Sequence, residues 1–227
     1  MIVAIDGPAG AGKSTVAKLI AAKLGYAYLD TGALYRALAW KALASGIDPA
    51  ASDAMSRLCR NTRLTVSLDH GDQPVVTVDG RVLTTELRKP EISEVASQVA
   101  ALPEVRAWLL PIQQAFGRQE GLRGIVAEGR DIGTKIFPSA GAKFFVNADP
   151  AERARRRQRD TGQLGRAEDM AQVQRDLEAR DRRDSTRHTA PLEVAADATV
   201  IDTTRLPVEQ VVERMLKVIA DKAAEHG

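Results

Sequence analysis

The sequence has little of what a secreted or membrane-anchored protein needs. Cys59 is the only cysteine among the 227 residues, so an intrachain disulfide is excluded and a cysteine-based metal site is not expected. No apolar run is long enough to cross a membrane. The first residues lead directly into a predicted strand, without the basic stretch that is typical of a signal peptide. These absences predict a cytoplasmic protein with no membrane partner.

Two further shortages concern nucleic acids. The formal net charge is only +2 at pH 7, and aromatic residues make up 4% of the chain. Nucleic-acid-binding proteins usually combine a strong positive charge with aromatic side chains on which bases stack, so neither DNA nor RNA is expected as a partner. Hydrophobic residues make up 44%, which is enough for a packed core. The length suits one α/β unit with an inserted subdomain.

A glycine-rich motif follows the first apolar run. Residues 7–14 read G-P-A-G-A-G-K-S and match the pattern G-x-x-x-x-G-K-[ST] at every constrained position, between the run Ile2–Ile5 and a helical pattern that stops at Gly25. Glycines leave backbone N–H groups open to a phosphate, and the N-terminus of the following helix adds partial positive charge. Lys13 is expected to reach the β- and γ-phosphates, and the Ser14 hydroxyl to bind Mg²⁺.

The alternative for this motif is a glycine-rich turn that holds no ligand. The strand, the spacing, the lysine and the serine together disfavour it, so the motif predicts that the chain binds a nucleoside triphosphate. The predicted ATP-binding residues are Gly7, Pro8, Ala9, Gly10, Ala11, Gly12, Lys13, Ser14 and Thr15.

Five apolar runs separated by helical patterns predict an α/β fold with a parallel, doubly wound sheet of about five strands. Polar residues follow three of the runs, at Asp30, Glu128 and Asn147. Ligands bind at the carboxyl ends of such strands, so these positions are candidates for a site. The five runs are Ile2–Ile5, Ala27–Leu29, Gly124–Ala127, Lys143–Val146 and Ala198–Ile201.

Residues 38–117 interrupt this pattern and are predicted to form an inserted domain. Three short alternating runs, separated by H-G-D at 70–72 and D-G at 79–80, predict an antiparallel meander, and two helices should follow it. The remaining core is predicted to consist of residues 1–37 and 118–227, with a lid at about 151–165. The predicted meander strands are Leu64–Leu68, Val75–Val78 and Arg81–Leu83, and the predicted helices are Ile92–Ala101 and Pro103–Phe116.

Four further sequence blocks resemble those of the bacterial cytidylate kinases, a family of P-loop nucleoside monophosphate kinases. They occur in the family's order and, with the glycine-rich motif, span essentially the whole chain. The meander also resembles the family's enlarged NMP-binding insert. The blocks are D-T-G-A-L-Y-R at 30–36, A-S-Q-V-A at 96–100 with Arg106, E-G-R-D-I-G-T at 128–134 and R-D-R-R-D-S-T-R at 180–187.

The resemblance implies a monomeric enzyme that transfers the γ-phosphoryl group of ATP to CMP or dCMP, with Mg²⁺ bridging the donor phosphates. Glu128, where many relatives have Asp, is implied to contact Mg²⁺ through water. The implied acceptor-site residues are Thr31, Arg36, Ser97, Arg106, Arg130, Asp131, Arg180, Asp184 and Arg187. The implied catalytic residues are Lys13, Arg130 and Arg187, with the lid arginines Arg153, Arg156 and Arg157 closing over ATP.

Within the acceptor site, the resemblance implies that Arg36, Arg130 and Arg187 hold the phosphate. It implies that Ser97, Arg106 and Asp131 read the base, and that Arg180 and Asp184 contact the ribose or its surroundings. The chemistry of cytosine agrees with the base assignment. Its N4 amino group is a donor that suits a carboxylate, whereas N3 and O2 are acceptors that suit an arginine and a hydroxyl.

Ordinary structural roles are the alternatives for these charged residues. Arg36 and Arg106 could be helix-surface charges in salt bridges, and Asp131 could cap the turn that follows it. The arginines of 180–187 lie among aspartates and could form a solvated face of ion pairs. The five arginines of Arg153–Arg159 have no acidic residue between them, which is more typical of a segment with an anionic partner.

Two rival functions differ in what they require of the sequence. Another P-loop kinase, acting on adenylate, uridylate or shikimate, would share the glycine-rich motif, but the meander and the set Ser97, Arg106 and Asp131 disfavour it. A P-loop protein that binds nucleic acid through its arginines would need more net charge and more aromatic residues. The cytidylate kinase interpretation is therefore preferred.

Overall fold

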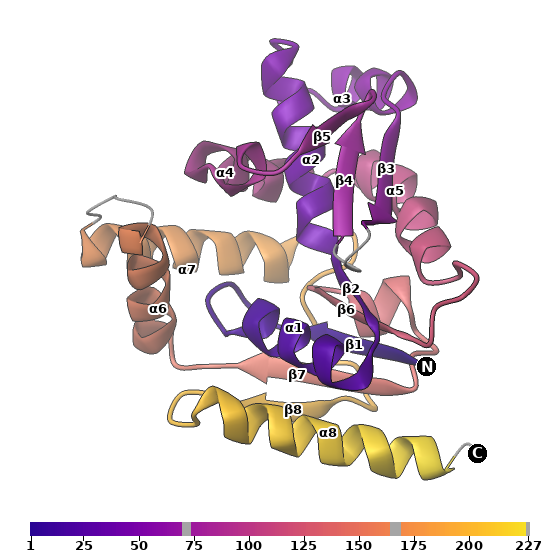
Figure 1. Cartoon of the computed structure of the whole chain (residues 1–227). Helices are drawn as coiled ribbons and strands as arrows, with labels where there is room; N and C mark the ends of the chain where they lie inside the picture. Colours follow the sequence, from indigo (N-terminus) through magenta and orange to yellow (C-terminus); the bar gives the residue numbers. More distant parts are fainter. Residues whose placement is uncertain (70–73, 164–168, 226–227) are drawn as a thin grey trace.

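The five apolar runs form one parallel sheet in the computed structural model, which describes residues 1–69, 74–163 and 169–225. The strand order is β2-β6-β1-β7-β8, so the strand that leads into the glycine-rich motif lies at the centre (Figure 1). The predicted doubly wound α/β fold is confirmed. The strands are β1 Ile2–Asp6, β2 Ala27–Asp30, β6 Ile125–Gly129, β7 Ala142–Asn147 and β8 Thr199–Asp202.

Both faces of this sheet are covered by helices. Val3 and Ile5 of β1 pack in one cluster with α1 (Lys13–Leu24) and α8 (Val208–Glu225), whereas Ala4 belongs to the cluster on the other face, which includes α2 (Thr31–Ala44). Successive residues of a strand point to opposite faces, so a strand that is buried on both sides must be apolar throughout. This is why the strands are visible as continuous apolar runs in the sequence.

The insert forms a second, three-stranded antiparallel sheet (Figure 1). Its strands are β3 Leu64–Leu68, β4 Pro74–Val78 and β5 Arg81–Leu83, which confirms the meander. Asp79 and Gly80 have φ values of 50° and 83°, so the D-G pair makes the tight turn that it predicts. The predicted H-G-D turn at 70–72 lies outside the described residues. The domain bounds at 38 and 117 stay a prediction.

The remaining helices belong to the insert or follow the carboxyl ends of the parallel strands. The second predicted insert helix has its expected bounds, whereas the first begins and ends two residues earlier than predicted, at Pro90 and Val99, because Pro90 is well suited to the first helical position. Residues 164 and 165 of the predicted lid region lie outside the described part of the chain. The helices are α3 Ser52–Arg60, α4 Pro90–Val99, α5 Pro103–Phe116, α6 Pro150–Gln163 and α7 Met170–Thr186, with a 3₁₀ turn at Glu86–Arg88 and a π-helical turn at Ile132–Ile136.

Across the described residues, no helix combines the length and the apolar character that a membrane span requires.

Candidate active site

The glycine-rich motif forms a loop between the end of β1 and the start of α1. Gly7 has a φ of +148°, and a Cβ atom there would lie 2.0 Å from the carbonyl oxygen of Val146 on β7. Gly10 has a φ of +75°, and its Cβ would lie 2.9 Å from the carbonyl oxygen of Arg153. Glycine is therefore needed at both positions for backbone conformation as well as for space. The close packing fixes the loop against β7 and α6.

Lys13 is buried at the first position of α1. Its Nζ atom donates a hydrogen bond to the carbonyl oxygen of Pro8 at 2.7 Å. Burial, followed by the nearby charge of Arg130, lowers the pKa of Lys13 to about 7. Ser14 and Thr15 are exposed in the same first turn, where the helix dipole favours an anion. The loop is thus equipped to receive phosphate, and an arriving anion would favour the charged form of Lys13.

A cavity of about 690 Å³ joins this loop to side chains of α2, α4, α5, α6 and α7. Its size is within the range of sites for nucleotide-sized ligands. Gly7, Pro8 and Arg153 are not part of its lining. The other predicted site residues all line it: Ala9, Gly10, Ala11, Gly12, Lys13, Ser14, Thr15, Thr31, Arg36, Ser97, Arg106, Glu128, Arg130, Asp131, Arg156, Arg157, Arg180, Asp184 and Arg187.

Three of the residues that line the cavity each carry a fully buried polar atom without a hydrogen-bond partner. These atoms are the Oγ of Ser97, the Nε of Arg180 and one terminal guanidinium nitrogen of Arg187. Buried polar atoms in proteins are nearly always hydrogen-bonded, and each exception calls for an explanation. A polar ligand in the cavity explains all three, because each of the three residues contributes to its lining.

Arg106 of α5 and Asp131, at the end of β6, form a buried ion pair. Arg106 also donates to the carbonyl oxygen of Ala100 at 3.1 Å, and its guanidinium carbon lies 5.4 Å from the centre of the Tyr35 ring. The second carboxylate oxygen of Asp131 lies 3.9 Å from a guanidinium nitrogen of Arg187. Asp131 makes no side-chain capping bond, so its role as a cap is excluded. Arg106 is only 7% exposed and is no surface charge.

The other arginines of this part of the cavity are held by carboxylates. Arg36 donates to Asp30 at 2.5 Å, and the Nε of Arg130 donates to Asp184 at 2.9 Å. Burial raises the pKa of Asp184, but the charges of Arg130, Arg180 and Arg187 outweigh this effect and keep that pKa below its usual range. Asp184 is 4% exposed, so its ion pairs do not belong to a solvated face, whereas Arg183 pairs with Glu94 on the exposed side of the helix.

Arg180 is the most strongly perturbed of these arginines. Burial, with the neighbouring charge of Arg130, lowers the pKa of Arg180 to about 10. Burial is the larger cause of this shift, and repulsion from the neighbouring arginine adds to it. An anionic ligand would relieve that repulsion, which is the expected property of a phosphate site.

Glu128 is a buried carboxylate between the loop and α2. The hydroxyl of Tyr28 on β2 donates to it at 2.6 Å, and the Thr31 hydroxyl donates to its backbone oxygen at 2.8 Å. A Cβ atom on Gly129 would lie 2.6 Å from the Thr31 Oγ1, so the glycine after Glu128 allows this close packing. These contacts fix the Glu128 side chain beside the phosphate loop.

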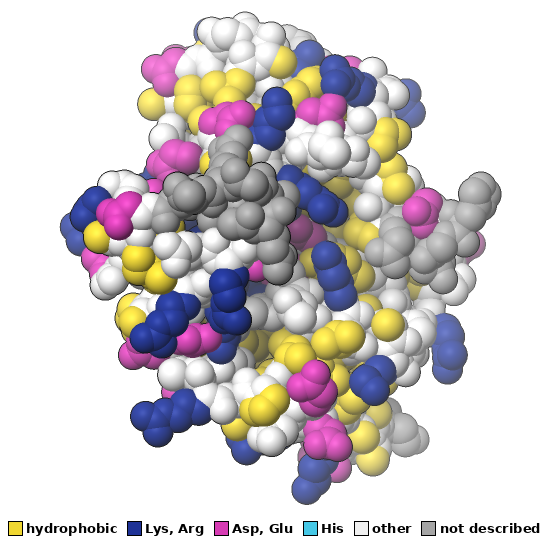
Figure 2. Space-filling view, turned by 60° about the vertical axis from the view of Figure 1, so that its left-hand side comes forward, with side chains coloured by type: hydrophobic (Ala, Val, Ile, Leu, Met, Phe, Trp, Pro, Cys, Tyr) yellow, Lys and Arg dark blue, Asp and Glu magenta, His cyan; other side chains and the backbone are white. Residues whose placement is uncertain are grey.

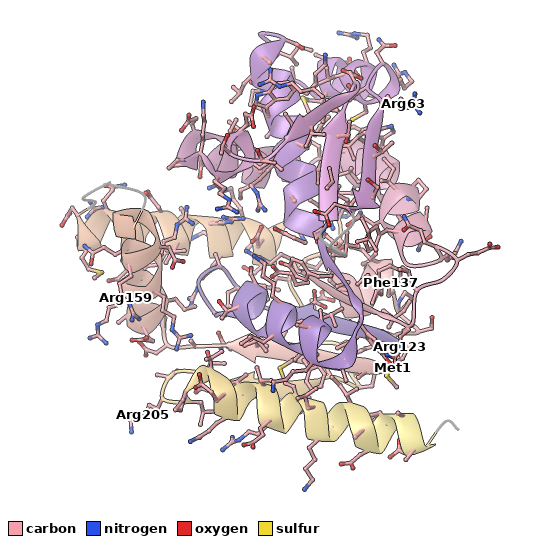
Figure 3. The ribbon with its side chains drawn as sticks, viewed as in Figure 1. Met1, Arg63, Arg123, Phe137, Arg159 and Arg205 are labelled. Atoms are coloured by element: carbon pink, nitrogen blue, oxygen red, sulfur yellow. The ribbon has the colours of Figure 1, made fainter. Side chains whose placement is uncertain are left out.

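The arginines of α6 have acidic partners that lie outside the stretch Arg153–Arg159. Glu152, just before it, pairs with Arg155, Arg156 and Arg159 at 3.5, 3.0 and 3.5 Å, because residues three, four and seven positions along a helix lie on the same face. Arg153 pairs with Asp181 of α7. Figure 2 shows basic and acidic side chains interspersed on the side that comes forward in that view, and Arg159 extends outward from α6 in Figure 3.

Two of these arginines support the phosphate loop from outside. Arg153 donates to the carbonyl oxygen of Ala9 at 3.1 Å, and Arg156 donates to that of Ala11 at 3.4 Å. Arg156 also donates to the hydroxyl and backbone oxygens of Thr203 at 2.9 and 2.7 Å. The Thr203 hydroxyl in turn donates to Ala11 at 3.1 Å. The structure thus divides the predicted lid arginines: Arg153 braces the loop, whereas Arg156 and Arg157 also line the cavity.

The sequence model for cytidylate kinase matches residues 3–221. The chain belongs to the cytidylate kinase family. A cytidylate kinase of Desulfitobacterium hafniense (strain Y51) is 46% identical over 220 residues, which cover 97% of this chain and 93% of the relative. A cytidylate kinase of Vibrio parahaemolyticus serotype O3:K6 (strain RIMD 2210633) is 44% identical over 99% of this chain and 97% of its own length. The resemblance seen in the sequence blocks is confirmed.

A solved structure supports the fold alone. An uncharacterized protein from Eubacterium ventriosum ATCC 27560 matches 97% of this chain and 98% of its own, with a TM-score of 0.51 at 12% identity. That likeness concerns the arrangement of helices and strands and not the chemistry of the site. Membership of the cytidylate kinase family therefore rests on the sequence comparisons.

Three buried polar residues near the site are not singled out by the sequence motifs of this cytidylate kinase family member. They are Asp6, which accepts a hydrogen bond from the backbone of Ile132, Tyr28, which donates to Glu128, and Thr203, which donates to the backbone of Ala11 in the phosphate loop. Asp6 does leave a signal, since a charged residue ending an otherwise apolar central strand calls for a partner. Tyr28 and Thr203 leave none, because both residue types are common in strands and turns.

Proposed function

We propose that this chain is an ATP-dependent cytidylate kinase, which converts ATP and CMP or dCMP to ADP and CDP or dCDP. The proposal rests on one observation: the phosphate loop and the buried Arg106–Asp131 pair line the same cavity. The first suits the phosphates of a nucleoside triphosphate, and the second suits the polar edge of a cytosine. Membership of the cytidylate kinase family supports the same substrate pair.

The acceptor nucleotide is proposed to lie with its base at Asp131 and its phosphate among the arginines. Asp131 would accept a hydrogen bond from the cytosine amino group, while Arg106 and Ser97 donate to the ring acceptors. The unpartnered Ser97 Oγ supports its role as a donor. Arg36, Arg130 and Arg187 are proposed to bind the phosphate, and Arg180 and Asp184 to contact the ribose or its surroundings. Thr31 positions Glu128 through its hydrogen bond to the backbone.

The proposed reaction needs no general base on the protein. A phosphate oxygen of CMP is already ionised near neutral pH, and it attacks the γ-phosphorus of ATP while the bond to the β-phosphate oxygen breaks and ADP leaves. Charge spreads over the transferred phosphoryl group, so positioning and charge neutralisation supply the catalysis. Lys13, Arg130 and Arg187 are proposed to provide that charge.

The donor nucleotide is proposed to bind its phosphates on the glycine-rich loop. Arg156 and Arg157 line the same cavity, and Leu206, Val208 and Val211 add apolar side chains to the lining. Apolar side chains suit the flat faces of a purine base. Arg153 is proposed to act indirectly, because its hydrogen bond to Ala9 holds the loop in shape.

Mg²⁺ fits the oxygen atoms near the loop. The Ser14 hydroxyl and the Glu128 carboxylate both line the cavity, and Mg²⁺ usually takes one or two such protein oxygens together with substrate phosphates and water. The described residues contain no group of three or more acidic, histidine or cysteine side chains that could hold a metal by themselves. Ser14 is proposed as the direct ligand, with Glu128 acting through water. The ion would neutralise charge on the donor phosphates.

A coupled assay of ADP formation tests this proposal across all ribo- and deoxyribonucleoside monophosphates. The expected result is turnover with CMP and dCMP well above that with the other acceptors. Preference for AMP, UMP or shikimate would place the chain with another P-loop kinase. A thermal-shift panel that includes oligonucleotides distinguishes the nucleic-acid-binding alternative, because a ligand of the folded state raises the unfolding temperature. The monomeric state stays a prediction, tested by light scattering.

A further inference from the structure

Asp6 is a buried carboxylate outside the glycine-rich motif, and the proposed reaction does not use it. It is the last residue of β1, immediately before Gly7, and is 4% exposed. In the sheet it lies in register with Gly129 of β6 and Phe145 of β7. This position places a carboxylate between the phosphate loop and the segment that continues β6. Because burying an unpaired charge is costly, a specific partner is expected.

The partners of Asp6 are two successive backbone amides on that neighbouring segment. Ile132 N–H donates to Asp6 Oδ1 at 2.8 Å, and Gly133 N–H donates to Oδ2 at 2.8 Å. Both carboxylate oxygens are therefore used. The two donors directly follow Arg130 and Asp131, which are proposed to bind the acceptor. Asp6 thus ties the start of the donor loop to the residues of the acceptor site.

These two amides begin the helical turn Ile132–Ile136, for which Asp131 is the preceding cap residue. An aspartate in that position commonly accepts a hydrogen bond from the amide of the second or third residue of the turn, here Gly133 or Thr134. Here Asp131 makes no capping bond, and its carboxylate pairs with Arg106 instead. Asp6 supplies the acceptors that Asp131 does not. The two aspartates therefore divide the tasks of capping the turn and facing the cavity.

The surroundings of Asp6 destabilise the charged form of its carboxylate. Burial raises the pKa of Asp6 to about 6, although its two backbone hydrogen bonds oppose the rise. Nearby Asp131 also raises the pKa, and Lys13 lowers it. A group that is unfavourable where it stands is commonly retained for a functional reason.

We propose that Asp6 is a positioning residue for acceptor recognition, which caps the Ile132–Ile136 turn and so leaves the Asp131 carboxylate to Arg106 and the base. Without Asp6, the Asp131 side chain is expected to turn toward the uncapped amide of Gly133. The Arg106–Asp131 pair would then lose its place in the cavity. The acceptor would be bound less well, and CMP would be distinguished less well from UMP.

The test compares the wild type with Asp6→Asn and Asp6→Ala. Both variants are expected to raise KM for CMP about tenfold, the effect of one lost buried polar contact, and to reduce the CMP/UMP ratio of kcat/KM similarly. KM for ATP should change by less than about threefold, because the phosphate loop itself remains intact. Asp6→Asn retains one acceptor oxygen, and Asp6→Ala removes both, so one variant can replace the other if it does not fold.

A control separates positioning from general loss of stability. Met215→Ala removes a fully buried side chain from the cluster beneath α8, away from the Ile132–Ile136 turn. It should lower the unfolding temperature while leaving the CMP/UMP ratio unchanged. If Asp6→Asn and Asp6→Ala only lower the unfolding temperature, as Met215→Ala does, Asp6 is a structural residue and the proposal is overturned.

A double-mutant cycle tests whether Asp6 acts through Asp131. In the Asp131→Ala background, Asp6→Asn should no longer change the CMP/UMP ratio, since the group it positions is gone. An unchanged effect in that background would overturn the proposal. Because this role presupposes the kinase activity proposed above, the wild type is assayed first. Failure of the wild type to phosphorylate CMP contradicts the proposed function, whereas a normal wild type with unaffected Asp6 variants contradicts only the role of Asp6.

Discussion

The arginines of α6 and those of the proposed acceptor pocket differ in how deeply their ion pairs with carboxylates are buried. On α6, Arg155 and Arg159 are more than 60% exposed and share Glu152 of their own helix. In the pocket, Arg106 and its partner from another element have side chains that are at most 7% exposed. Exposed pairs contribute about 0–1 kcal/mol, whereas breaking a buried pair costs about 3–5 kcal/mol because a charge is left uncompensated.

The two parts of the site therefore differ in how rigidly their charged side chains are held before a ligand binds. The acceptor pocket has its charges fixed before the nucleotide arrives, by pairs such as Arg106–Asp131 and Arg130–Asp184. The outer face of α6 has charges that can rearrange at little cost. We therefore propose that the rigid pocket recognises the base and that α6 adjusts around the donor phosphates. Variants of the two regions test this difference.

Lys13→Ala should have the largest effect, because Lys13 belongs to the loop that both regions face. Turnover is expected to fall by at least about 10²–10³-fold, the loss typical of removing one charge-stabilising donor from a transition state. The fold should persist, as checked by circular dichroism and thermal unfolding. Unchanged kcat in a well-folded variant would remove Lys13 from the mechanism.

Replacing Arg153, Arg156 and Arg157 together with Gln should lower turnover about tenfold to a hundredfold, and more than it weakens CMP binding. The reason is that two of these side chains brace the phosphate loop and two line the cavity. The matched control is Arg155→Gln on the same helix, because the Arg155 side chain is 65% exposed and does not line the cavity; it should leave kcat nearly unchanged. A loss of turnover in this control as large as that in the triple variant would show that α6 acts only through its overall charge.

Asp131→Ala should narrow the kcat/KM ratio between CMP and UMP about tenfold. Uracil presents O4 where cytosine has its amino group, so the wild-type carboxylate would face an acceptor at a cost of about 1–3 kcal/mol. Removing the carboxylate removes both the attraction for cytosine and the repulsion of uracil, with little effect on ATP binding. A ratio that stays at its wild-type value would mean that Asp131 does not read the base.

ATP binding should be accompanied by the uptake of less than one proton, the smallest of these effects. The pKa of Lys13 is lowered to about 7 in the folded protein from an ordinary value of 10.5, so between these pH values the folded state binds fewer protons than the unfolded state. The free energy of unfolding of the protein without ATP should therefore increase as the pH is raised from about 7 to 10.5. Bound phosphates favour the charged amine, so calorimetry at pH 8 in buffers of different ionisation enthalpy should detect uptake.

The matched variant for this measurement is Lys13→Met, which removes the titrating amine and leaves a side chain of similar length. It should abolish the proton uptake whether or not ATP still binds tightly. Uptake that persists in Lys13→Met would assign the proton to another group of the pocket.

Much of the site could be predicted because its residues lie in motifs whose chemistry is local. Gly10 needs its positive φ within a single turn, and the Asp79–Gly80 turn depends on neighbouring residues alone. The absence of an acidic residue within Arg153–Arg159 favoured an anionic partner over ion pairs, but Glu152 lies just outside that stretch and helix geometry brings it within reach of Arg156. The meander turn at 70–72 lies outside the described residues.

The phosphate loop and the five strands could be predicted from the sequence, because they depend on spacing over a few positions. Which charged side chains contact one another depends on the tertiary structure. Asp6 contacts Ile132, 126 positions away, and Arg156 contacts Thr203, 47 positions away. Such contacts follow from strand order and helix packing, and a buried charge takes whichever partner the completed fold places beside it.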